Sequence, residues 1–292
     1  MIEQVIHELY KKYEYPESFK QALTEVAKLL PSKEIVRILA CYESVDSFRF
    51  EKMTEIVKEL SIYYKIERYT INLFALLVLI PKLREFYKQN GIEQQVMDDT
   101  IADIRYKYDE CKRVHGVEGV VAWEGWYKQV FSLRLFQIGR LQYEYETFLF
   151  DKYEKDGKVV LKGDEILSVH IPATGTPLNH DECLESYKAA KEFFKEHFKG
   201  RQITFVCWSW LLNPENEKIM DEKSNIIRFK RDYDVIDREE YPDCNVLAPW
   251  IFGRKQVGSL EITPEDTSLQ KQIKAHLAQG GKLGRGYGVF FA

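Results

Sequence analysis

The alternation of strands and helices between Arg140 and Lys230 constrains the fold of this chain more than any other feature of its sequence. Strands that alternate with helices need crossover connections, which place some strands of one sheet parallel to each other. We therefore expect a mixed sheet, with the strand after the long helix parallel to the strand before it. The predicted strands cover 141–150, 158–161, 165–171, 202–207 and 231–236, and the predicted helices cover 179–198 and 214–227.

The first 119 residues carry a helical pattern throughout. Apolar residues recur at helical spacing over 18–30, and segment 63–80 is apolar on most faces, as in a buried central helix. Pro81 is expected to interrupt or kink that helix, and Gly116 to end the last one. The sequence thus predicts an α+β protein, with an all-helical N-terminal bundle over 1–119 and a second domain over 120–292.

The predicted boundary lies in a glycine-bearing segment, 116–125. Trp123, Trp126 and Tyr127 lie in this segment or just after it. Large aromatic side chains bury much area wherever they pack. We interpret these three as packing between the two domains, with ligand binding as the alternative.

The composition of the chain excludes several classes of binding partner. The net charge of −4 gives no strong attraction for nucleic acid or for an anionic membrane. The longest apolar run, 73–80, is far shorter than the roughly 20 residues of a membrane span. The five cysteines are dispersed without a CxxC pair, which favours reduced thiols and no zinc framework. We expect a cytoplasmic protein with no metal, no nucleic acid and no membrane partner.

The connection 172–178, between a strand and the start of a helix, is a candidate phosphate site. Thr174, Gly175 and Thr176 offer backbone amides and hydroxyls at the helix N-terminus. The alternative is a tight turn held by its own threonine hydrogen bonds.

Three side chains are candidates for acid–base or nucleophilic chemistry. His170 ends a strand and suits a general base, although a hydrogen-bonded structural histidine is the alternative. Glu144 shares one strand face with Glu146, and either could serve substrate or face solvent. Cys207 could be a nucleophile with His170 as its base, which would make the chain a hydrolase. Cysteines at the end of an apolar run are usually buried and inert.

Aromatic and basic residues near the ends of two strands are candidate ligand contacts. Trp208 and Trp210 could line an acyl or acceptor pocket or belong to the core. The glycine-rich run 281–288 lacks the following helix of a dinucleotide fingerprint, so we interpret it as close backbone approach. Within that run, Lys282 and Arg285 could clamp a phosphate.

The chain resembles a GNAT-type N-acyltransferase domain, and more closely the two-domain bacterial proteins that join a helical N-terminal domain to a GNAT-like C-terminal domain. The helical half fits by type and length. The strings that carry the resemblance in the other half are Gly139-Arg140-Leu141-Gln142-Tyr143-Glu144, Val169-His170-Ile171-Pro172, Cys207-Trp208-Ser209-Trp210-Leu211-Leu212, Ser224-Asn225-Ile226, Thr267-Ser268-Leu269-Gln270 and Ala275-His276-Leu277 with Gly280-Gly281.

The resemblance implies a largely antiparallel sheet with one parallel crossover, and acyl-CoA or acetyl-CoA as the donor. The acceptor would be a small-molecule or peptide amine, deprotonated by His170 or Glu144. Backbone amides near Cys207 would polarise the thioester carbonyl. The implied cofactor-binding residues are Ile171, Ala173, Thr174, Gly175, Thr176, Trp208, Lys282 and Arg285.

Segment 172–177 departs from the usual GNAT loop, in which a basic or amide residue precedes two small ones. Only Gly175 matches, and Pro172 and Pro177 remove two amide donors. Asp181 and Glu182 add negative charge at the helix start. These departures keep a second hypothesis open, a non-catalytic ligand- or partner-binding protein that retains the fold.

Overall fold

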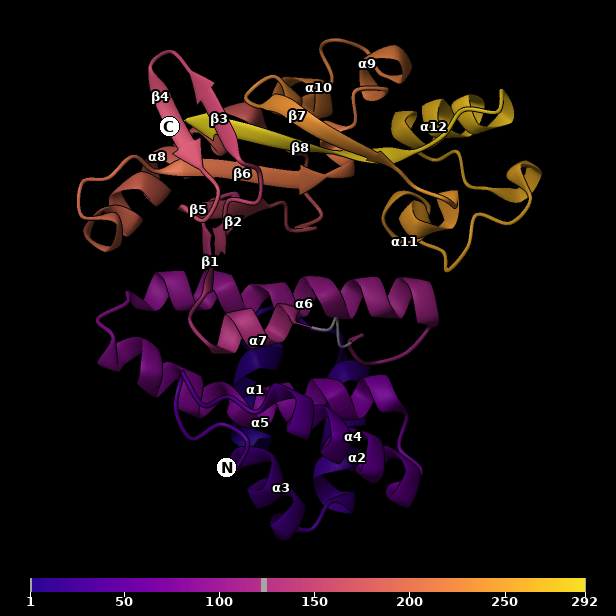
Figure 1. The fold of residues 1–292 in the computed structure, drawn as a ribbon. Coiled ribbons are helices and arrows are strands. Elements are labelled where there is room, and N and C mark those ends of the chain that lie inside the picture. Colours follow the sequence, from indigo (N-terminus) through magenta and orange to yellow (C-terminus); the bar gives the residue numbers. More distant parts are fainter. Residues whose placement is uncertain (1, 122–124, 292) are drawn as a thin grey trace. The chain divides into compact units, whose positions relative to one another are not determined.

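The computed structural model describes residues 2–121 and 125–291. Its contacts divide the chain into two compact units, Met1–Phe136 and Gln137–Ala292 (Figure 1). The first unit is built from helices, and the second combines a sheet with helices. The predicted α+β organisation, a helical N-terminal bundle followed by a mixed α/β domain, is confirmed.

The helices of the first unit are short except for two. They are α1 (Ile2–Lys12), α2 (Glu17–Leu29), α3 (Ser32–Leu39), α4 (Phe50–Tyr64), α5 (Arg68–Gln89), α6 (Gln94–His115) and α7 (Trp126–Phe131).

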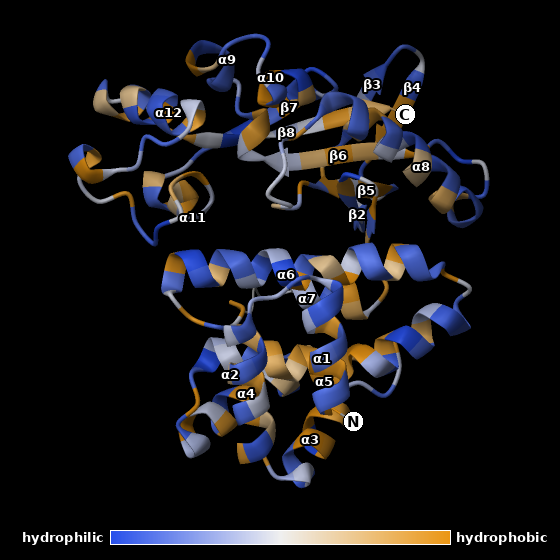
Figure 2. Cartoon of the chain, turned by 180° about the vertical axis from the view of Figure 1, so that it is seen from behind, coloured by the Kyte–Doolittle hydropathy of each residue, from blue (hydrophilic) through white to orange (hydrophobic). Residues whose placement is uncertain are grey.

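Helix α5 is the buried centre of this unit, as its apolar sequence predicts. Every residue over 70–80 is buried, and the helix is strongly apolar in Figure 2. It begins at Arg68 rather than at residue 63, because the Glu67 side chain accepts hydrogen bonds from the first backbone amides and caps it. The expected interruption at Pro81 is absent, since the helix continues through it to Gln89.

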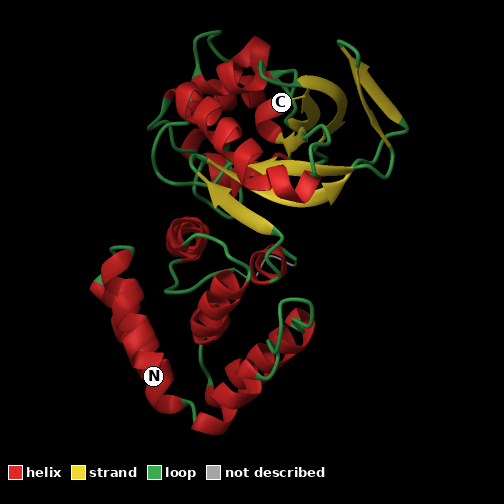
Figure 3. Cartoon of the chain, turned by 90° about the vertical axis from the view of Figure 1, so that its left-hand side faces the viewer, coloured by secondary structure: helices red, strands yellow, loops and turns green. Residues whose placement is uncertain are grey.

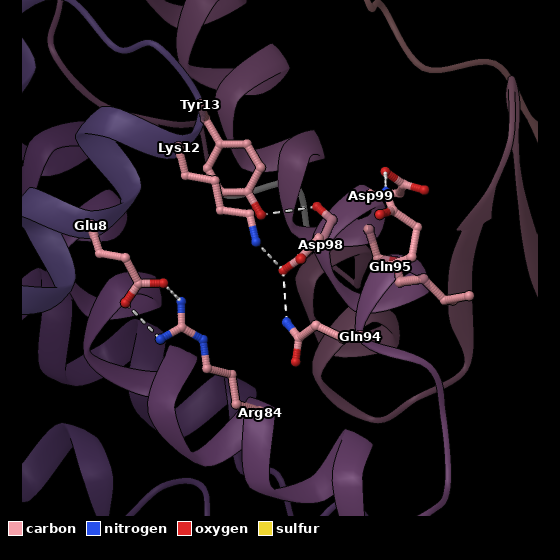
Figure 4. Close-up of polar contacts among 10 residues, drawn as sticks. Glu8, Lys12, Tyr13, Arg84, Gln94, Gln95, Asp98 and Asp99 are labelled. Atoms are coloured by element: carbon pink, nitrogen blue, oxygen red, sulfur yellow. Dashed lines mark hydrogen bonds and ion pairs between the residues drawn. The ribbon is translucent and has the colours of Figure 1, made fainter.

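Polar side chains tie α1 to α5 and α6 at the surface of the helical unit (Figure 4). Arg84 donates to both carboxylate oxygens of Glu8. Lys12 lies 2.5 Å from the Asp98 carboxylate, and the Tyr13 hydroxyl donates to the Asp98 carbonyl oxygen at 3.0 Å. These contacts link the first helix to the two longest ones, although ion pairs near the surface contribute at most about 1 kcal/mol each.

Helix α7 packs with the helices that precede it. The Tyr42 hydroxyl donates to the Phe131 carbonyl oxygen at 2.6 Å, and the Trp126 indole donates to buried Asp103 at 2.7 Å. Tyr127 is likewise buried, and Trp123 lies outside the described residues. The division by contacts therefore falls after α7, while the boundary drawn from the glycines at 119/120 stays a prediction.

The second unit is built around a six-stranded sheet in the order β1-β2-β5-β6-β8-β7, and β3 and β4 form a separate hairpin. The strands are β1 (Leu135–Ile138), β2 (Leu141–Thr147), β3 (Lys152–Lys155), β4 (Lys158–Leu161), β5 (Glu165–His170), β6 (Thr204–Ser209), β7 (Asp234–Glu240) and β8 (Gly284–Phe291). The helices are α8 (His180–Phe198), α9 (Asn216–Ile219), α10 (Asn225–Lys230), α11 (Ala248–Ile251) and α12 (Ser268–Ala278).

The sheet contains the predicted parallel pair. Strands β5 and β6 run parallel, joined across α8, whereas β2–β5, β6–β8 and β7–β8 are antiparallel. The Asn179 side chain caps α8 by accepting a hydrogen bond from the Asp181 amide. The single helix predicted over 214–227 is wrong: α9 ends at Ile219, and Ser224 caps a new helix, α10, with its hydroxyl.

The two faces of the sheet differ. Helices cover one side, and the β3–β4 hairpin lies on the other (Figure 3). The helical side buries one face of α8, including Cys183, Tyr187 and Phe194. On the hairpin side, Val160 packs in one cluster with sheet residues Ile166 and Val206.

Candidate active site

Two of the predicted catalytic residues form a hydrogen-bonded pair. Glu144 on β2 lies opposite Ser168 of β5, and His170 follows Ser168 by two residues on the same face. This diagonal brings His170 Nε2 to 2.9 Å from Glu144 Oε2. The two side chains are 29% and 10% exposed, so the pair is mostly shielded while the imidazole keeps contact with solvent.

The pairing suits the imidazole to proton transfer. When Nε2–H donates to the carboxylate, the lone pair that accepts a proton lies on Nδ1. The carboxylate also stabilises the imidazolium that forms on protonation, as a buried partner does in other histidine bases. The two candidates therefore form one hydrogen-bonded unit.

Strands β5 and β6 pair only over part of their length. Their parallel register consists of Leu167↔Phe205 and Ser168↔Val206, although β5 continues to His170 and β6 to Ser209. Strand β6 stays in register with β8 as far as Ser209↔Gly286. The paired register of β5 with β6 therefore ends beside His170, while that of β6 with β8 continues.

The connection from β5 to α8 carries the predicted phosphate-binding residues. Ala173, Gly175 and Thr176 are exposed, and Ile171 and Thr174 are half-buried. Gly175 has φ of +82°, a left-handed conformation that favours glycine. The Thr176 amide donates to Thr174 Oγ1, so part of the predicted tight turn is present. Among the described residues, no hydrogen bond uses the amides of Ala173 and Gly175.

Cys207 and His170 do not come together. Since Ser168 lies beside Val206, His170 shares the face of Val206, and Cys207 points to the opposite face. Cys207 is fully buried, and this burial raises the pKa of its thiol well above the ordinary range. Both facts oppose its use as a nucleophile.

Trp208 lies on the face of His170, opposite Tyr287 of β8. The Arg285 guanidinium stacks over the Trp208 ring, 4.5 Å from its centroid. Arg285 Nε also donates to Glu239 at 2.8 Å, and Lys282 donates to Glu240 at 2.9 Å. The two predicted phosphate-clamping cations are thus each paired with a carboxylate of β7.

Tyr287 is a candidate that the sequence patterns did not single out. Its side chain is buried against Phe148, Phe150 and Trp208, and its hydroxyl has no hydrogen-bond partner among the described residues. Burial, aided by the charge of Glu146, raises the pKa of this phenol, so it stays protonated and can donate. A buried orphan hydroxyl on the face of His170 marks a place for a ligand atom or water.

The glycines on either side of Tyr287 are the sequence signal that could have identified it as a site residue. Gly286 and Gly288 alternate with Tyr287, so they point to the other face of β8. There, a methyl group at Gly286 would overlap the Leu212 carbonyl oxygen, and one at Gly288 would lie 2.6 Å from a Leu212 methyl. The close backbone approach expected for this run is present.

Two further properties concern metals and membranes. Within the described residues, no group of three or more His, Cys, Asp or Glu side chains could hold a metal ion. In the same part of the chain, no helix has the length and apolar character needed to cross a bilayer.

Comparison with protein families assigns both halves of the chain. Residues 5–133 match the N-acyltransferase N-terminal domain, and residues 135–290 match the GNAT-like C-terminal domain. A search of curated proteins found none that matches the chain.

Solved acyltransferases share the fold. One, in complex with decanoyl-CoA and teicoplanin, has 22% identity and a TM-score of 0.73, with 98% of this chain and 87% of that chain covered. A second, in complex with CoA and 10C-teicoplanin, gives the same values. A third, in complex with decanoyl-CoA, has 20% identity and a TM-score of 0.65, with 98% and 99% covered.

Proposed function

Since this chain belongs to the family of two-domain GNAT-like N-acyltransferases, we propose that it transfers an acyl group from an acyl-CoA thioester directly to an amine. The observation that carries this proposal is the Glu144–His170 pair at the place where the pairing of β5 with β6 ends. A base at that edge lies where an amine could meet a thioester held between the two strands. Direct transfer needs no covalent enzyme intermediate, which agrees with the burial of Cys207.

The atoms and protons of the proposed acyl transfer balance when the residues of this site take part as follows. The amine nitrogen attacks the thioester carbonyl carbon while His170 accepts a proton from that nitrogen. A backbone amide of β6 beyond Val206 donates to the developing oxyanion. The C–S bond then breaks, the amide forms, and the CoA thiolate leaves and takes up one proton. Glu144 holds the imidazole in the required tautomer and stabilises its cation.

The donor is acyl-CoA or acetyl-CoA, with its pyrophosphate on segment 171–176, which precedes α8. Decanoyl-CoA bound to acyltransferases of the same fold supports a medium-length acyl chain. Teicoplanin in one of those complexes supports a small-molecule acceptor. The dispersed cysteines, none of which forms a disulfide among the described residues, support a cytoplasmic location.

Thermal unfolding of the full chain in the presence of CoA, acetyl-CoA and decanoyl-CoA tests the donor site. A ligand that binds only the folded state at 100 times its Kd stabilises by about 2.7 kcal/mol. We expect a saturable rise in Tm that grows with acyl length, because each buried CH2 adds about 0.8 kcal/mol. No shift with any of the three at millimolar concentration would favour the non-catalytic binding protein instead.

A further inference from the structure

A small polar cavity lies at the end of β7 in the C-terminal unit. Its volume is about 250 Å³, and its lining comes from β7, from α12, and from the segments that follow β6 and precede β8. Arg238, one of the lining residues, lies opposite Gly286, the neighbour of Tyr287 on β8. Side chains alternate along a strand, so Arg238 points away from the face that Tyr287 shares with His170. A ligand bound to Arg238 is therefore separate from the candidate active site.

Asn213 presents an unused hydrogen-bond donor to this cavity. The residue is only 7% exposed and belongs to the lining. Its backbone amide donates to the Trp210 carbonyl oxygen at 3.1 Å, and its Oδ1 accepts a hydrogen bond from the Glu215 amide at 3.3 Å. Its Nδ2 forms no hydrogen bond within the described residues. A buried donor of this kind is normally satisfied by a ligand or a water molecule.

Arg238 supplies a positive charge that the surrounding carboxylates do not pair. Its guanidinium forms no hydrogen bond or ion pair within the part of the chain that the structure describes. The three carboxylates that line the cavity are each paired with another cation. These pairs are Glu239–Arg285, Glu240–Lys282 and Glu215–Lys218. The Arg238 guanidinium and the Asn213 amide therefore provide donors for a carboxylate, which arginine can bind through two parallel hydrogen bonds.

His276 provides the opposite kind of group. Its Nε2 donates to the Lys282 carbonyl oxygen at 3.0 Å, so the neutral ring keeps Nδ1 as an acceptor. A Cβ at Gly281 would lie 2.3 Å from the His276 ring, so glycine is what allows the imidazole to lie against the backbone there. Together with the carboxylates of the lining, Nδ1 is suited to accept a hydrogen bond from an ammonium group.

A second cavity of about 440 Å³ adjoins the first. Pockets for drug-sized ligands span about 300–1,000 Å³, so the first cavity alone suits only a small polar group. Apolar side chains contribute to the second, so it can hold an apolar group attached to the polar one. These side chains are Tyr241, Leu277 and Leu283, and the residues common to both cavities are Glu240, Gly281 and Lys282.

We propose that these two cavities form a second ligand site, which binds a free amino acid with an apolar side chain. Arg238 and Asn213 hold the carboxylate, His276 and the neighbouring carboxylates receive the ammonium group, and the side chain enters the adjoining cavity. Three carboxylates around the same cavity disfavour a phosphate, because like charges repel. The site does not depend on the proposed acyl transfer, since its residues lie outside the candidate active site.

Calorimetric titration of the full chain with L-leucine tests the site. Arg238→Gln removes the charge that binds the carboxylate and should weaken binding by about tenfold or more. Asn213→Asp keeps the acceptor for the Glu215 amide but replaces the free donor with a negative charge, and it should weaken binding by a similar factor. Arg228→Gln is the matched control, since Arg228 is an exposed arginine of α10 outside the lining, and it should leave the Kd unchanged.

Two analogues of L-leucine test which of its groups are recognised. The compound 4-methylpentanoate lacks the amine, and 3-methylbutylamine lacks the carboxylate. Each should bind at least about tenfold more weakly than L-leucine, because a site built to hydrogen-bond a group rejects a ligand without it. Equal binding of either analogue, an unchanged Kd in Arg238→Gln, or no binding of L-leucine at millimolar concentration would overturn the proposal.

The variant His170→Ala separates this site from the candidate active site. It should bind L-leucine as tightly as wild type, because His170 and Arg238 lie on opposite faces of the sheet. Loss of binding in His170→Ala would place the ligand beside the Glu144–His170 pair and would also overturn the proposal.

Discussion

In the proposed mechanism, His170 accepts the proton and Glu144 supports it. Removing the imidazole removes proton transfer, so His170→Ala should lower kcat/KM by about 100-fold or more. Glu144→Gln keeps the size of the side chain but loses the charge that stabilises the imidazolium, and we expect a smaller loss of about tenfold. Steady-state kinetics with decanoyl-CoA and an accepted amine would measure both.

A second histidine–carboxylate pair in the same unit provides the matched control. His197 Nε2 lies 3.0 Å from Glu165 Oε1 near the far end of α8. His197→Ala should change kcat/KM by less than about threefold. Equal effects of His170→Ala and His197→Ala would mean that the loss reflects general damage to the fold rather than a missing base.

Substitution of Tyr287 by phenylalanine can distinguish an effect on activity from an effect on stability. Because its hydroxyl is buried without a protein partner, Tyr287→Phe should leave the fold as stable or raise its stability by up to about 1 kcal/mol. If the hydroxyl serves a bound ligand, the same variant should lose about tenfold in kcat/KM. Unchanged kinetics of Tyr287→Phe would exclude a role for this hydroxyl in the site. Thermal unfolding would measure the stability of the variant.

The residues of the site were predictable one by one, but their pairing was not. His170 ends a strand that its apolar pattern predicts, and Glu144 lies on another. Which residue of β2 meets His170 depends on the register between the two strands, and a shift of one residue would have turned Glu144 to the other face. The same rule separates Cys207 from His170, although they lie on neighbouring strands.

Strand β8 depends on its glycines for close packing. Gly286→Ala would push a methyl group into the Leu212 carbonyl oxygen, a rigid neighbour, and overpacking of this kind costs about 1–3 kcal/mol. We expect faster hydrogen exchange over Gly284–Phe291, measured by mass spectrometry. Val159→Ala, in the exposed strand β4, is the control and should change little. Unchanged exchange in Gly286→Ala would contradict the close approach.

Elements with a strong local signal were predicted well. Helix α8 has a capping residue, one apolar face and the length of a single long helix. The crossover through it makes β5 and β6 parallel. The prediction of one helix over 214–227 was wrong because the apolar residues of this segment fit one helix as well as two. The hydroxyl cap at Ser224 restarts the helix there, and packing of α9 and α10 on the rest of the unit decides the outcome.

The molecule as a whole combines two units that each have their own core. The buried residues of α5 form the core of the first unit, and the sheet packed against α8 forms the core of the second unit. Sequence periodicity predicted this organisation because the first part of the chain carries the helical period alone, and strand patterns begin only at residue 141. Segment 171–176, the end of the β5–β6 pairing and the Glu144–His170 pair all belong to the second unit.

The most direct test of the account is product formation from decanoyl-CoA. Wild type and His170→Ala would be incubated with decanoyl-CoA and a set of small-molecule and peptide amines, with CoA thiol release and acylated products followed by mass spectrometry. The account predicts one N-decanoyl amide for each CoA released by wild type, and about 100-fold less by His170→Ala. Thiol release without any amide product, or equal rates for the two proteins, would contradict it.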